Sequence, residues 1–307
     1  MTRRISYRRR LTGAMIVAAL MVNTPTATAQ TPEQKSRIRT GIDEAIQAVD
    51  HLPSMKKMSP QEKRELVEFT VGKTLFVMAH EMGHVVINEL DLPVLGREED
   101  AADSFAIIMA LQLRSAFSER VLMETAKGWV LSSYRDKKAN TALAFYGEHG
   151  LDRQRAYHVI CMMVGSDPDR FKTLAKEAKL PEWRQRSCVR DYGAAAWSWE
   201  KALKPHLRSA DQPKVTIKVE YKDEEKFPIT AGILRHMGVL EAFADNAADQ
   251  FAWPRPFSME ARACGEPNAR WFFATQTLVL CHELVGHFVA LFQNYSRKLP
   301  AGLRSKR

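Results

Sequence analysis

Residues 59–87 read SPQEKRELVEFTVGKTLFVMAHEMGHVVI, and this stretch decides the fold of the first half of the chain. Ser59 is a good N-cap, Pro60 suits the first helical position, and Glu62 completes a capping box. No residue that breaks helices more strongly than glycine follows before Pro93, so we expect one helix of about thirty residues. The later half of this helix is apolar on nearly every side, which predicts a buried central helix.

Within this helix, residues 80–84 read HEMGH, the pattern H-E-x-x-H. Two histidines four residues apart lie on one helix face, so His80 and His84 can bind the same metal ion. Glu81 lies beside them, where a carboxylate can take a proton from a metal-bound water. Burying these three side chains without a ligand or partners would be unfavourable. We therefore expect one Zn²⁺ ion here rather than three core residues that satisfy one another.

The third metal ligand is expected from residues 96–103, which read GREEDAAD. A catalytic zinc site has three protein ligands and an open position, and a short turn would bring this acidic segment back against the first helix. Glu99 and Asp103 are four residues apart and share a helix face, whereas Glu98 points about 100° away. We predict Glu99 as the third ligand, Asp103 as an acceptor for a ligand histidine, and Glu98 as a helix N-terminal charge.

H-E-x-x-H followed by E-x-x-x-D resembles the gluzincin branch of zinc peptidases. In that branch the glutamate is the third ligand, and the aspartate supports the first histidine, which here is His80. The spacing from His84 to Glu99 is shorter than in thermolysin-like gluzincins. The resemblance implies a zincin-like metallopeptidase core.

A closer resemblance is to a bacterial family described as "putative metallopeptidases", a domain of unknown function. Four runs carry it: HEMGH at 80–84, LPVLGREEDAAD at 92–103, VGSDP at 164–168 and CGEPNA at 264–269. The resemblance covers most of residues 60–296 and implies zinc-dependent peptidase activity. In that family a Cys-Tyr-Glu-Leu run follows the run that corresponds to CGEPNA. This chain has CHEL at 281–284 instead, so the family's tyrosine has no counterpart here and implies no role for His282.

The two ends of the chain differ from its body. Residues 1–29 combine clustered arginines, a short apolar run and an A-x-A pattern that ends at Ala29. This order is typical of a secretory signal peptide cleaved after Ala29, so we expect an exported protein, periplasmic or secreted. The apolar run is too short for a stable membrane span. The sequence leaves open whether export uses the twin-arginine route.

The charge of the chain is concentrated at these ends. The 307 residues carry a formal net charge of +9, but residues 1–29 and the basic tail 297–307 hold five basic residues each and no acidic one. The body between them is close to neutral, so a nucleic-acid partner is not expected. A composition of 45% hydrophobic and 26% charged residues is that of a globular protein.

All four cysteines lie in the body of the chain, and an even number in an exported protein favours disulfides. We predict the local pairs Cys161–Cys188 and Cys264–Cys281, because each pair falls within one part of the chain. The alternative for Cys161 is a buried free thiol.

The periodicity of the remaining sequence predicts an α+β fold that is predominantly helical. We expect helices at 117–137, 151–164, 168–178, 181–203, 230–251 and 282–296, and strands at 215–221, 257–263 and 277–281. This pattern divides the chain into a helical metallopeptidase domain at 30–210 and a smaller mixed α+β part at 211–296.

Other polar residues compete for a role. His282 and His287 are five residues apart, about 140° around a helix, so they cannot share one ion unless the helix begins after His282. We interpret His282 and Glu283 mainly as a helix start. A donor for the developing oxyanion stays open among three residues, His149, Tyr157 and His158. An arginine-rich stretch that includes Arg155 is expected to be a solvated surface.

These observations predict an exported zinc-dependent peptidase in which His80, His84 and Glu99 hold zinc and Glu81 activates the attacking water. The expected partner is a peptide or protein substrate. The alternative is a non-catalytic envelope protein in which the metal is structural and residues 213–296 bind a partner. The sequence does not distinguish endo- from exopeptidase action and does not predict the oligomeric state.

Overall fold

The computed structural model describes residues 32–300 and Leu303. The predicted signal peptide, its cleavage after Ala29 and the last residues of the basic tail lie outside the described residues. No described helix is long and apolar enough to cross a membrane.

Helices make up the first two thirds of the chain. In chain order they are α1 Pro32–Val49, α2 Pro53–Lys56, α3 Pro60–Glu89, α4 Glu98–Gln112, α5 Ala116–Lys138, α6 Asp152–Ser166, α7 Lys172–Glu177 and α8 Glu182–Leu203. Helix α7 begins at Lys172 and not at Pro168, because residues 168–171 form a turn.

The last third is mixed. It contains β1 Ile217–Tyr221, α9 Pro228–Met237, α10 Val239–Gln250, β2 Phe257–Arg262, β3 Ala269–Phe272, β4 Thr277–Cys281 and α11 His282–Tyr295. The predicted single helix at 230–251 is divided at Gly238, whose φ of +57° is left-handed and ends α9. The short strand β3 was not predicted. The mostly helical α+β class is confirmed.

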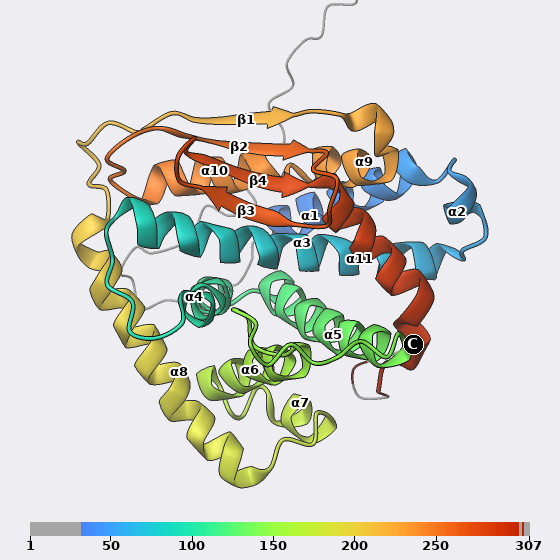
Figure 1. The fold of residues 1–307 in the computed structure, drawn as a ribbon, viewed down its shortest axis with the longest axis horizontal. Coiled ribbons are helices and arrows are strands. Elements are labelled where there is room, and N and C mark those ends of the chain that lie inside the picture. The colour runs from blue at the N-terminus through green and yellow to red at the C-terminus, as the bar shows by residue number, and fades with distance from the viewer. Residues whose placement is uncertain (1–31, 301–302, 304–307) are drawn as a thin grey trace, which may run out of the picture.

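Helix α3 is the long central helix that the sequence predicts. The Ser59 side chain accepts a hydrogen bond from the Glu62 backbone amide, and the Glu62 carboxylate accepts one from the Ser59 amide, so the capping box is formed. The sheet lies along one side of α3, and the helices α4, α5 and α6 lie along the other (Figure 1). Helix α3 is buried because it lies between these two layers.

The sheet has the strand order β1-β2-β4-β3. The strands β1, β2 and β4 are parallel, whereas β3 is antiparallel to β4 and places Trp271 opposite Leu278. All five residues of β4 are buried. Strands β1 and β3 are the two edges of the sheet, and β3 packs against α3.

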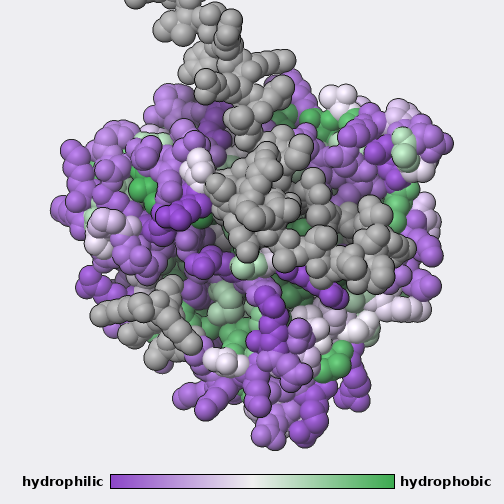
Figure 2. Space-filling view, turned by 180° about the vertical axis from the view of Figure 1, so that it is seen from behind, coloured by the Kyte–Doolittle hydropathy of each residue, from purple (hydrophilic) through white to green (hydrophobic). Residues whose placement is uncertain are grey.

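The helical and mixed parts share one hydrophobic core. Helix α1 packs against α9, and α11 packs against α3 and α5. The predicted domain boundary near residue 210 stays a prediction. In the structure, residues on both sides of it contribute to the same hydrophobic core. On the face opposite to that of Figure 1, hydrophilic side chains dominate the described surface (Figure 2).

The structure contains both predicted disulfides, Cys161–Cys188 and Cys264–Cys281. The first links α6 to α8. At this crossing a Cβ on Gly165 would lie only 2.2 Å from the Cys188 carbonyl oxygen, so only glycine fits. The second links the segment after β2 to the end of β4.

Replacing Cys264 and Cys281 together by alanine is expected to lower the free energy of unfolding by about 3 kcal/mol, because the unfolded chain regains the freedom of this loop. Denaturant unfolding of the variant and of the wild type, each with and without a reducing agent, measures the effect. Equal stability of the two non-reduced proteins would contradict the prediction.

Candidate metal centre

The buried later half of α3 carries His80, Glu81 and His84, and the first turns of α4 face it. The two helices approach closely at Gly83, where a Cβ would lie 3.0 Å from the Cα of Ala102. Larger side chains at these two positions would push α4 away from α3. The small residues thus set the distance across which the α4 carboxylates reach the histidines.

Three possible ligand atoms converge between the helices. The Nε2 atoms of His80 and His84 lie 3.3 Å apart, and Oε2 of Glu99 lies 3.1 Å from the first and 3.6 Å from the second. Ligands that bind one zinc ion tetrahedrally at about 2.0–2.1 Å are separated by about 3.3–3.4 Å. The spacing of the three atoms therefore fits a single zinc ion.

The hydrogen bonding of these atoms also fits a metal site. Glu99 Oε2 is buried and has no hydrogen-bond partner of acceptable geometry, although imidazole nitrogens surround it. The two Nε2 atoms face each other rather than a carbonyl or hydroxyl group. A buried carboxylate oxygen and two facing imidazole nitrogens are the donor set that zinc prefers.

Each histidine is oriented from behind by a carboxylate. His80 Nδ1 lies 2.8 Å from Asp103 Oδ1, and His84 Nδ1 lies 2.7 Å from Glu98 Oε1. A ring whose Nδ1 donates to a carboxylate presents the lone pair of Nε2 to the metal. The sequence placed Asp103 in this role and Glu98 only at the helix N-terminus. It missed the contact with His84, because that contact depends on how α4 crosses α3.

Asp103 is itself held by Arg155 of α6. The guanidinium donates two hydrogen bonds, at 2.8 Å to Oδ2 and 2.6 Å to Oδ1, and only 11% of the arginine side chain is exposed. The expectation of a solvated Arg155 is therefore wrong. Its guanidinium carbon lies 3.9 Å from the ring centre of Trp129, and Lys73 Nζ lies 3.3 Å from the same centre. Burial lowers the pKa of Lys73 to about 7.

Metal binding at this site is coupled to the release of a proton. Burial lowers the pKa of His84, but the neighbouring carboxylates of Glu99 and Glu98 outweigh burial and raise this pKa to about 9. Burial would raise the pKa of Glu99, but the surrounding imidazoles hold it far below its usual range. Without metal, His84 is therefore protonated at neutral pH, and an incoming ion must displace that proton.

Glu81 is the remaining residue of the H-E-x-x-H pattern. It is 7% exposed and accepts a hydrogen bond from the backbone amide of Trp271 in β3. Burial raises the pKa of Glu81, whereas His80 and His84 lower it less. A carboxylate with a raised pKa is a better proton acceptor than an exposed one.

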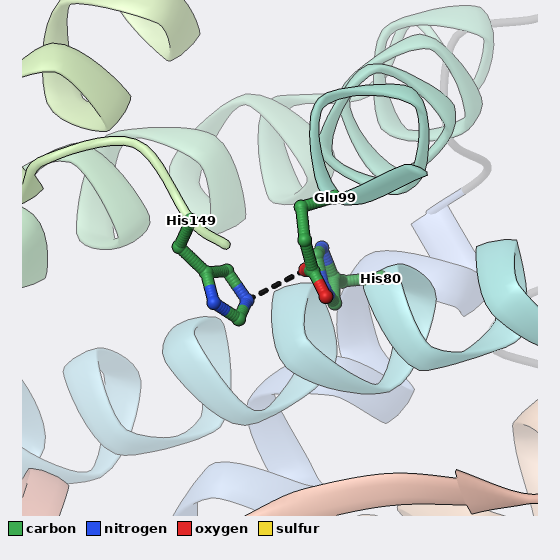
Figure 3. Close-up of side chains that lie close together, drawn as sticks. All are labelled: His80, Glu99 and His149. Carbon is green, nitrogen blue, oxygen red and sulfur yellow. Dashed lines mark ion pairs between the residues drawn. The ribbon is translucent and has the colours of Figure 1, made fainter. Parts of the chain in front are cut away.

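One further histidine reaches the site from a loop. His149 Nε2 lies 2.6 Å from Glu99 Oε2, and its ring is stacked on that of His80 (Figure 3). Of the three residues left open as donors, only His149 lies here. Tyr157 donates to the Ala178 carbonyl and His158 lies 3.4 Å from Ser104 Oγ.

The second histidine pair of the sequence forms no site. His282 begins α11 as predicted and is fully buried, with its Nε2 2.8 Å from the Lys222 carbonyl oxygen. His287 lies beside Arg135. Glu283 accepts hydrogen bonds from the backbone amides after β2, next to the second disulfide.

Arg155→Ala is expected to weaken zinc binding by about 10- to 100-fold, because Asp103 would lose the partner that holds it behind His80. Arg153→Ala is the matched control, since Arg153 is exposed on the same helix. Competition with a chelating indicator measures both affinities. Equal affinities of the two variants would show that the Arg155–Asp103 contact does not position the ligand histidine.

Residues 41–203 match the model of the DUF4344 family, whose description reads "Putative metallopeptidase". The matched region contains every residue placed above around the metal centre except Trp271. No curated protein and no solved structure matches the chain.

Proposed function

The chain belongs to this family of "putative metallopeptidases", and from this premise we propose that it is an exported zinc-dependent peptidase. The observation that carries the proposal is the convergence of two imidazole nitrogens and one buried carboxylate oxygen at zinc-ligand spacing. The buried base Glu81 lies beside them on the same helix. Metal-dependent hydrolysis requires both of these parts.

In this proposal His80, His84 and Glu99 hold the zinc ion. When bound, zinc would polarise a substrate carbonyl and lower the pKa of water. Asp103 and Glu98 keep the two rings in the orientation that presents Nε2. Glu81 accepts the proton of the attacking water and passes it to the leaving nitrogen.

The neighbouring strand supports a peptide as the substrate. Strand β3 is at the edge of the sheet and lies against α3, and the amide of Trp271 reaches Glu81. An extended peptide can pair with the edge of a sheet through its backbone and so lie beside a catalytic group. A peptide bond held along β3 would therefore pass close to Glu81.

The disulfides support the exported location. Disulfides form and persist in oxidising compartments, and this chain has two with no free cysteine among the described residues. Together with the predicted signal peptide at 1–29, they favour a periplasmic or secreted protein.

One observation favours the alternative of a non-catalytic, metal-stabilised envelope protein. A fourth protein donor, His149, lies against Glu99, and structural zinc sites are closed by four protein ligands. The enzyme remains the better proposal, because a structural site has no use for a buried base such as Glu81 beside the ligands.

The deciding experiment combines metal content with an unbiased peptide library. We expect one zinc ion per chain and cleavage that stops with a chelator and returns when zinc is restored. Stoichiometric zinc without cleavage of any peptide would favour the binding protein. Absence of zinc from a metal-replete preparation would overturn both.

A further inference from the structure

The segment that carries His149 is a surface loop between α5 and α6, residues 139–151. Its apolar side chains lie outside the core: Leu143 is 57%, Phe145 79% and Tyr146 94% exposed. Backbone hydrogen bonds within residues 140–147 are local, for example from Gly147 to the Ala144 carbonyl. A segment with so few buried contacts opens at low free energy.

His149 is the residue of this loop that reaches into the metal centre. Its Nε2 and the ligand atoms of His80 and Glu99 all lie within 4.8 Å of one another. The His149 and His80 rings are 5.7 Å apart and nearly parallel, with 27° between their planes. Figure 3 shows His149 on its loop facing the Glu99 carboxylate, which comes from α4, with His80 of α3 beside it.

The contact between His149 and Glu99 is short and joins two possible metal-ligand atoms. The two atoms are 2.6 Å apart, yet Glu99 Oε2 has no hydrogen-bond partner of acceptable geometry. A neutral imidazole nitrogen is a zinc ligand, and the ligand atoms of His149, His80 and Glu99 lie close enough together to hold one ion. His84 is not part of this group of three, although its Nε2 lies 3.3 Å from that of His80, so binding of one ion by all four side chains requires a small movement of the loop.

We propose that His149 is a fourth, exchangeable zinc ligand, and that residues 139–151 form a lid which keeps the resting enzyme latent until the lid is displaced. This inference rests on the proposed function. A peptidase needs its fourth coordination position for water, and His149 competes for that position. The exposed lid makes the exchange easy, because opening it uncovers no buried core.

X-ray absorption spectroscopy of the zinc-loaded protein tests the ligand directly by counting imidazoles. We expect three in the wild type and two in His149→Ala. His158→Ala is the matched control, since His158 lies on the next helix beside Ser104, and it should keep three imidazoles. Two imidazoles in the wild type would overturn the proposal, whatever the variants hydrolyse.

Peptide hydrolysis tests latency separately. If His149 blocks the open position for most of the time, its removal raises kcat/KM by the inverse of the open fraction, on the order of tenfold. His158→Ala should leave the rate unchanged. A rate that falls in His149→Ala with two imidazoles in both proteins would assign His149 to substrate or oxyanion binding and reject the lid. Failure of all proteins to cleave peptides would reject the peptidase, whereas the imidazole count would still decide the role of His149.

Discussion

Glu81→Gln should retain zinc at one ion per chain and lose peptide hydrolysis by roughly 100- to 10,000-fold, the range expected when a general base is removed. Glutamine has nearly the same shape, and its carbonyl oxygen can still accept the hydrogen bond from the Trp271 amide. The fold and the metal ligands are therefore preserved. Only the ability to take up a proton is lost.

The matched control is Glu65→Gln on the same helix, where the side chain accepts a hydrogen bond from Gln61 and lies away from the metal centre. Zinc content and initial rates with one cleaved peptide are measured for all three proteins at equal metal loading. Near wild-type hydrolysis by the Glu81 variant would contradict the proposed mechanism. Loss of zinc from it would instead mean that Glu81 is itself a ligand.

The parts of this site that could be predicted from the sequence are those encoded within one element. Helix α3 is defined by a local capping box and a long helical pattern. The spacing of His80 and His84 places both on one face, and the spacing of Glu99 and Asp103 does the same on α4. The cysteine pairs were also predictable, because each pair is close in sequence.

Contacts between different helices and loops could not be predicted from the sequence. Arg155 and Asp103 are 52 residues apart in the sequence, and the Trp129 ring packs against the Arg155 guanidinium that makes this contact. His149 reaches Glu99 from a loop whose sequence has no helical or strand period. Such contacts follow from the angles at which helices cross, which periodicity does not specify.

In the last third of the chain, the structure differs from the sequence prediction at β3 and at Gly238, again because periodicity does not specify these features. Strand β3 has only four residues and lies at an edge of the sheet, so its sequence shows no clear alternation of apolar and polar residues. Gly238 interrupts a continuous helical pattern because it adopts a left-handed conformation that glycine tolerates, whereas Gly72 and Gly83 lie inside helix α3. The strand is nevertheless the element that brings a backbone amide to Glu81.

Glu99→Ala is expected to weaken zinc binding by more than the roughly 100-fold reached by variants that only orient a ligand, and to abolish hydrolysis with it. The reason is that Glu99 Oε2 lies 3.1 Å from His80 Nε2 and 3.6 Å from His84 Nε2 and supplies the only carboxylate among the three ligand atoms. Without it the two histidines retain no negative partner at the metal.

Three adjacent carboxylates of α4 allow a graded test of this assignment. Glu98 supports His84 from behind, so Glu98→Ala should weaken zinc binding by about 10- to 100-fold. Asp100 pairs with Arg97 on the surface, so Asp100→Ala should leave the affinity unchanged. Zinc competition titrations of the three variants should therefore rank Glu99 above Glu98 and Glu98 above Asp100 in the affinity lost. If Glu98→Ala abolishes binding while Glu99→Ala retains it, the third ligand is Glu98, and the Glu99 carboxylate only neutralises charge beside His149.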